Sequence, residues 1–493
     1  MTDAASILRI DPRDDVATAL VALAAGDSAG GVTARTAIPA GHKIALNAVA
    51  AGDPVLKYGW PIGRASADIA PGDHVHSHNL ATALSGLEAY SFAPSAPEPL
   101  PAGGGETFDG YRRADGRVGT RNEIWVLCTV GCVARTAQKI AEAANRRFAG
   151  RVEGVVALTH PFGCSQLGDD LAATRGMIAA LARHPNAGGV LIIGLGCESN
   201  QLAPLLASLE GVDPARLRAF AAQMTEDEVE AGLDAVEALV QIAEHDKRVP
   251  CLVSDLVIGL KCGGSDGFSG LTANPLVGRV ADAVTGAGGT AVLTEIPEIF
   301  GAEHLLMARA RDETVFDAVV EVVNDFKSYF LAHGEPISEN PSPGNIEGGV
   351  TTLEEKSLGA VQKAGRGTVT QVLRYGQRTD RPGVVLLEAP GNDAVSSTAL
   401  TAAGATVILF TTGRGTPLGF PAPTLKIATN CGLAQRKPRW IDFDAGRIAA
   451  GQPLDQAAEA LMALVLATAS GRATRSEENG EREIALWKRG VTL

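Results

Sequence analysis

The sequence predicts an α/β protein in which a small strand-rich N-terminal module is followed by a linker and two doubly wound, parallel-sheet (Rossmann-like) regions. From residue 108 onward, apolar runs of strand length alternate with amphipathic helical stretches, as in parallel sheets covered by helices. Aromatic residues make up only 4% of the chain and glycines number 57, which favours aliphatic strands joined by glycine turns. We therefore expect a module at residues 1–90, a linker at 91–107, and α/β domains at 108–375 and 376–493.

Local patterns predict the individual elements. In the N-terminal module, closely spaced turns separate short β-like pieces, while residues 14–25 have the apolar spacing of a helix. Pro, Gly, Ser and Ala dominate the linker, so the module is tethered and could close over a site. Buried strands are expected at residues 123–130, 154–159, 189–195, 257–260, 290–294, 384–387, 406–410 and 424–428.

Composition excludes several classes of function. The net charge of the 493 residues is −13 and Lys and Arg form no cluster, so nucleic-acid binding is not expected. The N-terminus is polar and no apolar run is long enough to span a membrane, so we expect no membrane association and a cytoplasmic protein. The seven cysteines are odd in number and widely spaced, which argues against a disulfide framework.

Histidines gather near the end of the N-terminal module. On a strand, His74, His76 and His78 would face the same side, and His42 is available from another turn. Imidazole is a common ligand of borderline metals. The histidines are therefore candidates for metal binding or substrate contact, with a solvated strand edge as the alternative.

Three expected strands lead into loops that carry a cysteine, namely Cys164, Cys197 and Cys262. Parallel strands end on one edge of their sheet, so the three thiols could converge on a shared site. The alternative is three small apolar residues packed under loops. The loop of Cys262 is rich in glycine and also contains Lys261 and Asp266, which adds an ammonium and a carboxylate to the thiol.

Further loops suit the recognition of an anion. Arg414 lies between glycines and hydroxyl residues, where its guanidinium could bind a carboxylate with two hydrogen bonds. Asn392 and Asn430 follow two other strands of the same region. The sequence contains neither a dinucleotide fingerprint, nor a Walker A motif, nor a nucleophile elbow, so nucleotide cofactors are not supported.

Long motifs along essentially the whole chain resemble one enzyme family. They include HKIAL, HVHSHN, GYRRADGRVGTRNE, TVGCV, HPFGCSQLGDD, GLGCESNQ, CGGSDGFSGLTANP, LTEIPEIFGAEHLL, ENPSPGNIEGGVTTLEEKSLG, APGNDAV, TTGRGTPLGF and WIDFDAG. In these motifs the chain is similar to the altronate/galactarate dehydratases, and its first module resembles their SAF domain. The resemblance implies an iron-dependent hydro-lyase that converts D-altronate into 2-dehydro-3-deoxy-D-gluconate and water in hexuronate breakdown.

The implied reaction assigns provisional roles to the candidate residues. A divalent metal would stabilise the enediolate formed when the C2 proton leaves, and an acid would assist loss of the 3-hydroxyl. The implied metal is Fe²⁺, with Mn²⁺ as an alternative ion and an iron–sulfur cluster as an alternative cofactor. Expected metal ligands are either His76, His78 and His42 or the thiols of Cys164, Cys197 and Cys262; expected acid/base groups are His160, Glu198 and Asp266; expected substrate contacts are Arg121, Asn392, Arg414 and Asn430.

Other functions remain open from the sequence. The same chemistry on galactarate or another sugar acid would require different contacts at the far end of the substrate. A non-catalytic sugar-acid sensor would need the anion-binding loops but neither the thiols nor the histidines. An iron-binding structural protein would leave the loops of Asn392 and Arg414 unexplained. The sequence also leaves open whether the chain forms a homo-oligomer.

Overall fold

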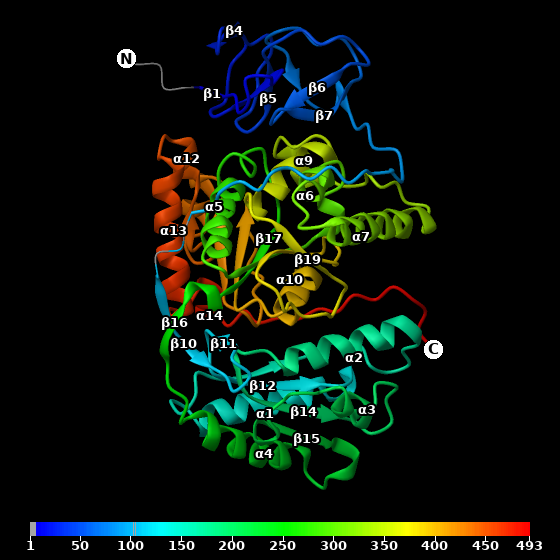
Figure 1. Cartoon of the computed structure of the whole chain (residues 1–493), viewed down its shortest axis with the longest axis vertical. Coiled ribbons are helices and arrows are strands. Elements are labelled where there is room, and N and C mark those ends of the chain that lie inside the picture. The colour runs from blue at the N-terminus through cyan, green and yellow to red at the C-terminus, as the bar shows by residue number, and fades with distance from the viewer. Residues whose placement is uncertain (1–5, 102, 104) are drawn as a thin grey trace.

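The protein consists of three units stacked along its long axis, as the computed structural model shows for residues 6–101, 103 and 105–493 (Figure 1). The N-terminal unit lies at one end, and a linker leads from it past the third unit to the second unit at the opposite end. The chain then returns to form the third unit in the middle. The expected order of a strand-rich module, a linker and two α/β regions is confirmed.

The N-terminal unit is built from short antiparallel strands. One sheet has the order β1-β2-β5-β8, a second has the order β6-β7-β9, and β3 and β4 form a hairpin. Their bounds are β1 Ile7–Leu8, β2 Val16–Ala19, β3 Ser28–Ala29, β4 Val32–Thr33, β5 Lys43–Ala45, β6 Pro54–Lys57, β7 Trp60–Ala65, β8 His74–Val75 and β9 Leu80–Ala81.

The helix expected at residues 14–25 is wrong. Strand β2 occupies the start of this stretch and pairs with β5, where Ala17 lies opposite Ile44. All four residues of β2 are buried, so both faces of the strand are covered. A short run that is apolar on both faces does not alternate, and its spacing therefore imitates that of a helix.

The linker is extended and lies against the third unit. Between Leu80–Ala81 and β10 (Thr107–Arg112), the described residues form neither helix nor strand. The backbone N–H of Ser95 donates to the carbonyl oxygen of Ala308 at 2.7 Å, and Arg366 donates to Glu98 at 3.0 Å. The expectation of an irregular linker is met in the residues described, which leave out 102 and 104.

The second unit contains a four-stranded parallel sheet in the order β13-β12-β14-β15. Helices α1 and α4 cover one face, where Ile140 and Val236 share a core with Ile124. Helix α2 covers the other face and packs against α10 of the third unit, so the two units share a core. The bounds are β12 Glu123–Cys128, α1 Ala134–Arg147, β13 Val155–Leu158, α2 Gly168–Ala182, β14 Ala187–Gly194, α3 Leu202–Ala207, β15 Leu217–Ala221 and α4 Glu228–Ala243.

The third unit is organised around a seven-stranded parallel sheet in the order β19-β20-β18-β17-β21-β22-β23. Its strands are β17 Val257–Cys262, β18 Thr290–Leu293, β19 Val369–Leu373, β20 Gly383–Leu387, β21 Val407–Thr412, β22 Thr424–Ala428 and β23 Phe443–Asp444. A small sheet, β11-β10-β16, uses Val118–Gly119 and Val249–Leu252 beside β10 and connects the second and third units.

Helices surround the seven-stranded sheet on both faces. On one face α5 and α13 pack against each other, and on the other face α10 packs against β17. The bounds are α5 Ala273–Gly286, α6 Glu303–Met307, α7 Glu313–Ala332, α8 Pro343–Glu347, α9 Leu353–Ala360, α10 Asp393–Ala402, α11 Cys431–Arg436, α12 Gly446–Ala449, α13 Leu454–Ala469 and α14 Arg475–Glu478.

The boundary expected at residue 375 falls inside this seven-stranded sheet. Strand β17 pairs with β21, and β18 pairs with β20, so strands from both sides of the expected boundary form one sheet. All eight strands expected from the apolar runs are present, but the runs themselves do not indicate which strands share a sheet. The second α/β unit therefore ends before β17, and the third unit begins there.

Buried charges attach the N-terminal unit to the third unit. Lys43 and Lys57 each donate to Glu355 of α9 at 2.8 Å, and all three side chains are at most 2% exposed. Thr82 and the backbone N–H of Ala83 donate to the carboxylate of Glu354. The N-terminal unit is therefore docked on α9 in this structure, in addition to being tethered by the linker (Figure 1).

Candidate active site and metal-ligand group

A cavity of about 810 Å³ opens at the carboxyl ends of strands β17, β18 and β20. This is the edge at which open parallel sheets bind their ligands. Helices α7 and α9, residues 337–345 and the C-terminal segment supply its other walls. The polar side chains that line it are Cys262, Glu298, Glu339, Asn340, Ser342, Asn345, Lys356, Asn392 and Asp393, and the aromatic ones are Phe326, Tyr329, Phe330 and Trp487.

Backbone geometry brings three of the reactive side chains together. At Gly263, directly after β17, a Cβ atom would lie 2.5 Å from the ring of Phe410 and 2.8 Å from the carboxylate of Asp393, so a larger residue does not fit. Beyond β18, Glu295 adopts a left-handed conformation with φ of 69°, and a single 3-10 turn, Ile296–Glu298, follows. The turn places the carboxylates of Glu295 and Glu298 on the same side as the thiol of Cys262.

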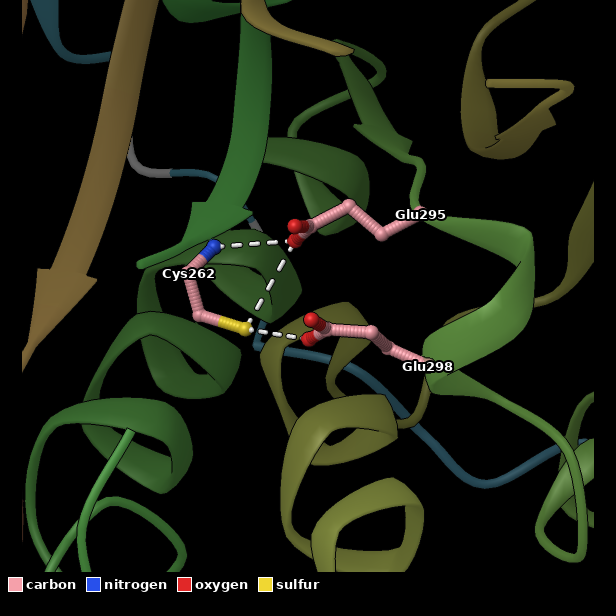
Figure 2. A group of neighbouring side chains, drawn as sticks. All are labelled: Cys262, Glu295 and Glu298. Atoms are coloured by element: carbon pink, nitrogen blue, oxygen red, sulfur yellow. Dashed lines mark hydrogen bonds between the residues drawn. The ribbon is translucent and has the colours of Figure 1, made fainter. Parts of the chain in front are cut away.

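Cys262, Glu295 and Glu298 form a compact group of metal-ligating atoms (Figure 2). The Cys262 thiol lies 3.0 Å from Glu298 Oε2 and 3.5 Å from Glu295 Oε2, and the backbone N–H of Cys262 donates to Glu295 at 3.0 Å. One ligand atom from each residue lies within 4.8 Å of the other two. Among the residues that the structure describes, this is the one group of three or more such side chains at that spacing.

Three buried lysines neutralise the acidic groups. Lys261 bonds both Glu295 and Asp393, the latter at 2.8 Å, and Lys356 donates to Glu298 Oε1 at 2.9 Å. Lys363 lies 3.9 Å from Glu295. The carboxylates of Glu295, Glu298 and Asp393 are thus balanced by an equal number of ammonium groups, which is how buried charges are accommodated.

The mutual fields of these charges shift their pKa values. Burial, reinforced by the charges of Glu295 and Glu298, raises the pKa of the Cys262 thiol to about 12. Burial opposes ionisation of Glu298, but Lys356 and Lys261 outweigh it and lower the pKa of Glu298 to about 2. The pKa of Glu295 is raised by burial and by the charge of Glu298. The two carboxyl groups are therefore poised for different protonation states.

Lysine protonation follows from the same fields. Burial lowers the pKa of Lys261, but the charges of Glu295 and Asp393 more than offset it and raise that pKa above its usual value. The pKa of Lys356 is also raised, because Glu298 outweighs the penalty of burial. Both side chains are therefore cations rather than bases, and Lys356 presents its charge to the cavity.

The histidines of the N-terminal unit converge as expected. His42 Nδ1 lies 3.0 Å from His74 Nε2, and the rings of His76 and His78 lie 5.3 Å and 5.6 Å from that of His74. His42 and His76 also contact the backbone carbonyl oxygens of Glu347 and Ile346 in α8. The cluster therefore faces the segment that covers the cavity, and its own role as a metal site stays a prediction.

Asp266 fixes loops at the carboxyl edge of the seven-stranded sheet. It accepts hydrogen bonds from Thr429 at 2.9 Å and from Asn430 at 3.0 Å, and burial raises its pKa. The backbone N–H of Gly267 donates to the carbonyl oxygen of Gly348, next to α8. Asp266 and Asn430 are thus engaged in fixing loops and do not line the cavity, although both were expected to contact the reaction centre or substrate.

The other expected substrate contacts are distributed over the molecule. Asn392 lines the cavity, where it also caps α10 by accepting from the backbone N–H groups of Ala394 and Val395. Arg414 is exposed and donates to Glu347 at 2.7 Å. Arg121 is buried, forms two hydrogen bonds with Glu477 and also donates to backbone carbonyls, so its guanidinium is directed away from the cavity.

The three thiols expected to converge lie on two different sheets. Cys164 and Cys197 follow β13 and β14 of the four-stranded sheet, whereas Cys262 ends β17 of the seven-stranded sheet. His160 and Glu198 lie near the first two thiols and fix their loops: His160 Nε2 contacts the Cys128 carbonyl, and Glu198 accepts from Thr129. A catalytic role for either residue stays a prediction, since neither lines the cavity.

The acidic and basic partners of Cys262 were not among the expected site residues. Glu295 and Glu298 follow the strand expected at residues 290–294, so their position after a strand was a usable signal. Asp393 lies next to the expected Asn392. Lys356 comes from α9, and no local pattern connects a helical lysine with a distant sheet edge.

Family models match three consecutive parts of the chain. The altronate/galactarate dehydratase SAF domain matches residues 5–83, the D-galactarate dehydratase/altronate hydrolase second domain matches 110–244, and the D-galactarate/altronate dehydratase C-terminal region matches 253–492. The altronate dehydratase of Escherichia coli K12 is 50% identical over 99% of both chains. That of Bacillus subtilis 168 is 46% identical over 99% of this chain and 100% of its own.

A third relative, the galactarate dehydratase (L-threo-forming) of Escherichia coli K12, is 36% identical over 88% of this chain and 86% of its own. Similarity of this extent to dehydratases makes the chain an enzyme of the hydro-lyase class. More narrowly, the chain belongs to the altronate/galactarate dehydratase family. No helix in the described residues combines the length and apolar character needed to cross a bilayer.

Proposed function

We propose that the enzyme dehydrates D-altronate to 2-dehydro-3-deoxy-D-gluconate in the breakdown of hexuronates. The observation that carries this proposal is the 50% identity with an altronate dehydratase over 99% of both chains. The cavity supports it as well, because it is wide enough for a six-carbon acid and combines a cation, carboxylates and amides. These groups match the carboxylate and the row of hydroxyls of an aldonate.

The reaction requires stabilisation of negative charge. The C2 proton of an aldonate is weakly acidic, and its removal places a second negative charge on the carboxylate as an enediolate forms. Preorganised cations in a water-poor site stabilise such charge. Lys356 is the cation that lines the cavity, and Asn340 and Asn345, which both accept from its ammonium, lie beside it. We assign Lys356 to the substrate carboxylate.

Proton transfer is assigned to a carboxylate of the cavity. Asp393 is more accessible than Glu298, with 34% of its side chain exposed, and Lys261 holds it at 2.8 Å. We assign to Asp393 removal of the C2 proton and its delivery to the departing 3-hydroxyl, which leaves as water. Glu298, whose pKa is lowered to about 2, stays ionised and accepts the hydrogen bond of the Cys262 thiol.

The donor set of Cys262, Glu295 and Glu298 fits a divalent ion of borderline character. Thiolate and carboxylate ligands suit Fe²⁺ or Mn²⁺, and the spacing within 4.8 Å allows all three to reach one ion. When bound, such an ion supplies Lewis-acid polarisation of the substrate carboxylate and 2-hydroxyl. Binding would release the thiol proton of Cys262 and loosen the contacts of Lys261 and Lys356 with the carboxylates.

Turnover on a panel of acids tests the proposal. D-Altronate, galactarate and D-galactonate are supplied to the full chain with Fe²⁺ or Mn²⁺ or after chelation, and the 2-oxo acid product is identified by mass. The proposal expects the highest kcat/KM with D-altronate and loss of activity in Lys356→Met, while Lys139→Met, an exposed lysine on α1, serves as control. Preference for galactarate would retain the reaction class and replace the substrate.

Chelation separates this enzyme from a sugar-acid sensor. A sensor binds altronate equally well after chelation and releases no product. The assignment of the ion is tested in the same experiment, since Glu298→Gln should weaken metal binding if Cys262, Glu295 and Glu298 hold it. If His76→Gln weakens binding instead, the ion belongs to the histidine cluster that the sequence predicted.

The cellular setting belongs to the same proposal. A cytoplasmic enzyme with a small sugar acid as its partner fits hexuronate breakdown, and light scattering of the purified chain would determine whether it forms a homo-oligomer.

A further inference from the structure

Three exposed cysteines lie at one edge of the four-stranded sheet. Cys164 follows β13, Cys132 follows β12 and Cys197 follows β14, and these three strands are neighbours in the order β13-β12-β14. All three strands are parallel, so the three loops leave the sheet on the same side. Free cysteines are usually buried, and three exposed ones on adjacent loops need an explanation.

Hydrogen bonds join the three loops close to the thiols. The backbone N–H of Gly131, beside Cys132, donates to the carbonyl oxygen of Phe162 at 2.8 Å. The backbone N–H of Asn200 donates to the carbonyl oxygen of Gly163, beside Cys164, at 3.0 Å, and the Asn200 side chain donates to the Thr129 carbonyl at 3.0 Å. The loops therefore form one rigid surface that carries a thiol from each.

The backbone around the thiols is shaped to expose them. Gly163 has φ of 100°, and a Cβ atom there would lie 2.1 Å from the carbonyl oxygen of Thr129. Ser165, on the other side of Cys164, holds a left-handed conformation with φ of 54°, which is unfavourable for a residue with a side chain. Gly196, before Cys197, has φ of 130°. Such conformations persist where the surrounding structure requires them, often at functional sites.

Polar groups lie within hydrogen-bonding distance of two of the sulfur atoms. Gln223 Nε2 donates to the Sγ of Cys197 at 3.6 Å, and the Ser165 hydroxyl lies 3.7 Å from the Sγ of Cys164. Hydrogen bonds to cysteinyl sulfur are characteristic of thiolates that ligate metal clusters. The nearby Cys128 differs, since it is buried and burial raises its pKa to about 12, so it does not join the exposed set.

We propose that Cys132, Cys164 and Cys197 hold an iron–sulfur cluster of the [4Fe–4S] type. Three thiolates bind three of its irons, and the fourth iron keeps an open position for an oxygen ligand or water. A single tetrahedral ion is a poorer match, because among the described residues the three sulfurs are not part of a group within 4.8 Å of one another. The cube-shaped [4Fe–4S] core holds the sulfur atoms of its cysteine ligands farther apart than a single ion does.

Assembly of the cluster needs no redox step within the protein. Each thiol loses its proton to solvent and forms one Fe–S bond. Equal amounts of ferrous and ferric ion, with one sulfide per iron, supply the core at its 2+ charge, so no oxidant or reductant is consumed. The site is separate from Cys262, Glu295 and Glu298, because the two groups belong to different sheets. It differs from the set expected from the sequence in that Cys132 takes the place of Cys262.

Reconstitution of the full chain without oxygen tests the proposal. Iron and acid-labile sulfide are measured after incubation with equal amounts of ferrous and ferric ion and sulfide and removal of the excess, together with the visible absorbance. We expect about four sulfide per chain, with about four irons in the cluster in addition to any ion held by Cys262, Glu295 and Glu298. The triple variant C132S/C164S/C197S should lose essentially all of the sulfide, and each single serine variant should retain a small fraction. The matched control is Cys431→Ser, a partly exposed cysteine of the third unit.

Far-ultraviolet circular dichroism and the unfolding midpoint establish that each variant is folded. The proposal is overturned if the wild type binds no sulfide, or if the triple variant retains as much sulfide as the wild type. Because sulfide content is read without substrate, failure of the cluster leaves the proposed dehydration untouched. Failure of altronate turnover with a full cluster would refute the substrate alone.

Discussion

The carboxyl edges of the two parallel sheets place reactive side chains at the same topological position in opposite environments. At the edge of the seven-stranded sheet, Cys262, Glu295 and Glu298 are at most 5% exposed and are surrounded by lysines. At the edge of the four-stranded sheet, Cys164 and Cys197 are exposed on loops joined by backbone hydrogen bonds. A cysteine after a parallel strand therefore indicates a site, but the neighbouring elements decide its chemistry.

The first prediction concerns the sheet edge at which proton transfer takes place. Asp393→Asn removes an accessible carboxylate from the cavity, and we expect kcat for altronate to fall about 10²–10⁴-fold, the usual contribution of a positioned acid or base. Glu198→Gln at the other edge should change kcat by less than about tenfold. Partial burial raises the pKa of Glu198, but hydrogen bonds from Thr129 and from backbone N–H groups outweigh this effect and lower that pKa. These hydrogen bonds indicate that Glu198 fixes a loop.

Steady-state kinetics with Fe²⁺ measures both variants. The exposed Glu339→Gln at the cavity rim is the matched control, because it also removes one carboxylate charge from the lining. If Glu198→Gln reduced kcat more than Asp393→Asn, the reaction would belong to the four-stranded sheet, and the catalytic role predicted for Glu198 from the sequence would be restored.

A second prediction concerns the cover of the seven-stranded edge. Glu355→Gln leaves Lys43 and Lys57 buried with one fewer negative charge, and we expect the free energy of unfolding to fall by about 3–5 kcal/mol. Denaturant unfolding is followed by the fluorescence of the four tryptophans, of which Trp60 lies in β7 against His304 at this interface. Glu347→Gln, whose partner is the exposed Arg414, is the control and should cost at most about 1 kcal/mol.

The same carboxylate makes this interface sensitive to acid. Burial opposes ionisation of Glu355, but Lys43 and Lys57 outweigh it and lower its pKa from the usual 4.5 of a glutamate to about 2. Since the folded pKa lies below the unfolded one, the contribution of Glu355 is complete above about pH 4.5 and is lost as the pH falls toward 2. Equal acid sensitivity of wild type and Glu355→Gln in this window would contradict the assignment.

The histidine cluster predicts a pH effect of smaller size. Partial burial lowers the pKa of His42, His74 and His76, with that of His74 reaching about 4. The unfolded chain then binds more protons than the folded one between about pH 6.5 and 4, so stability decreases as the pH falls through this window. After solvent screening of these half-buried groups, we expect a loss of about 1–2 kcal/mol between pH 7 and 5.

Urea unfolding at the two pH values measures this loss. His74→Gln should reduce the difference between pH 7 and pH 5, whereas the exposed His333→Gln should leave it unchanged. A difference that is the same in wild type and His74→Gln would assign the pH dependence to groups outside the cluster.

The sequence predicted the fold better than it predicted the site. Each of the eight expected strands is present, because most of their residues are apolar and buried, although polar residues such as Glu123 and Lys426 occur in two of them. The strands that were missed, such as Leu217–Ala221 and Val369–Leu373, include polar residues and lie toward the sheet edges. Apolar runs do not state which strands pair, which is why Cys262 was grouped with two thiols of another sheet.

The site residues also show that local sequence patterns do not reveal which distant segments meet. His42 meets His74, His76 and His78 as expected, but strand β8 ends at Val75, so His76 and His78 reach His74 from the turn that follows it and not by alternation along a strand. Glu298 and Lys356 meet through the packing of α9 against the turn after β18, which no local pattern encodes. Arg121 was expected to bind substrate because of its motif, yet its guanidinium is paired with Glu477 from the distant C-terminal region.

The smallest expected effect distinguishes a surface ion pair from a substrate contact. Arg414 donates to Glu347 at 2.7 Å with 46% of its side chain exposed, so Arg414→Gln should lower the free energy of unfolding by at most about 1 kcal/mol. If Arg414 contacts only Glu347, KM for altronate stays within about twofold, because the cavity is lined by Lys356 and not by Arg414. If KM rises at least tenfold with kcat unchanged, Arg414 supplies uniform binding to the substrate carboxylate. That result would extend the active site from the cavity across α8 toward the histidine cluster, and Glu347→Gln, which frees the guanidinium, should then lower KM.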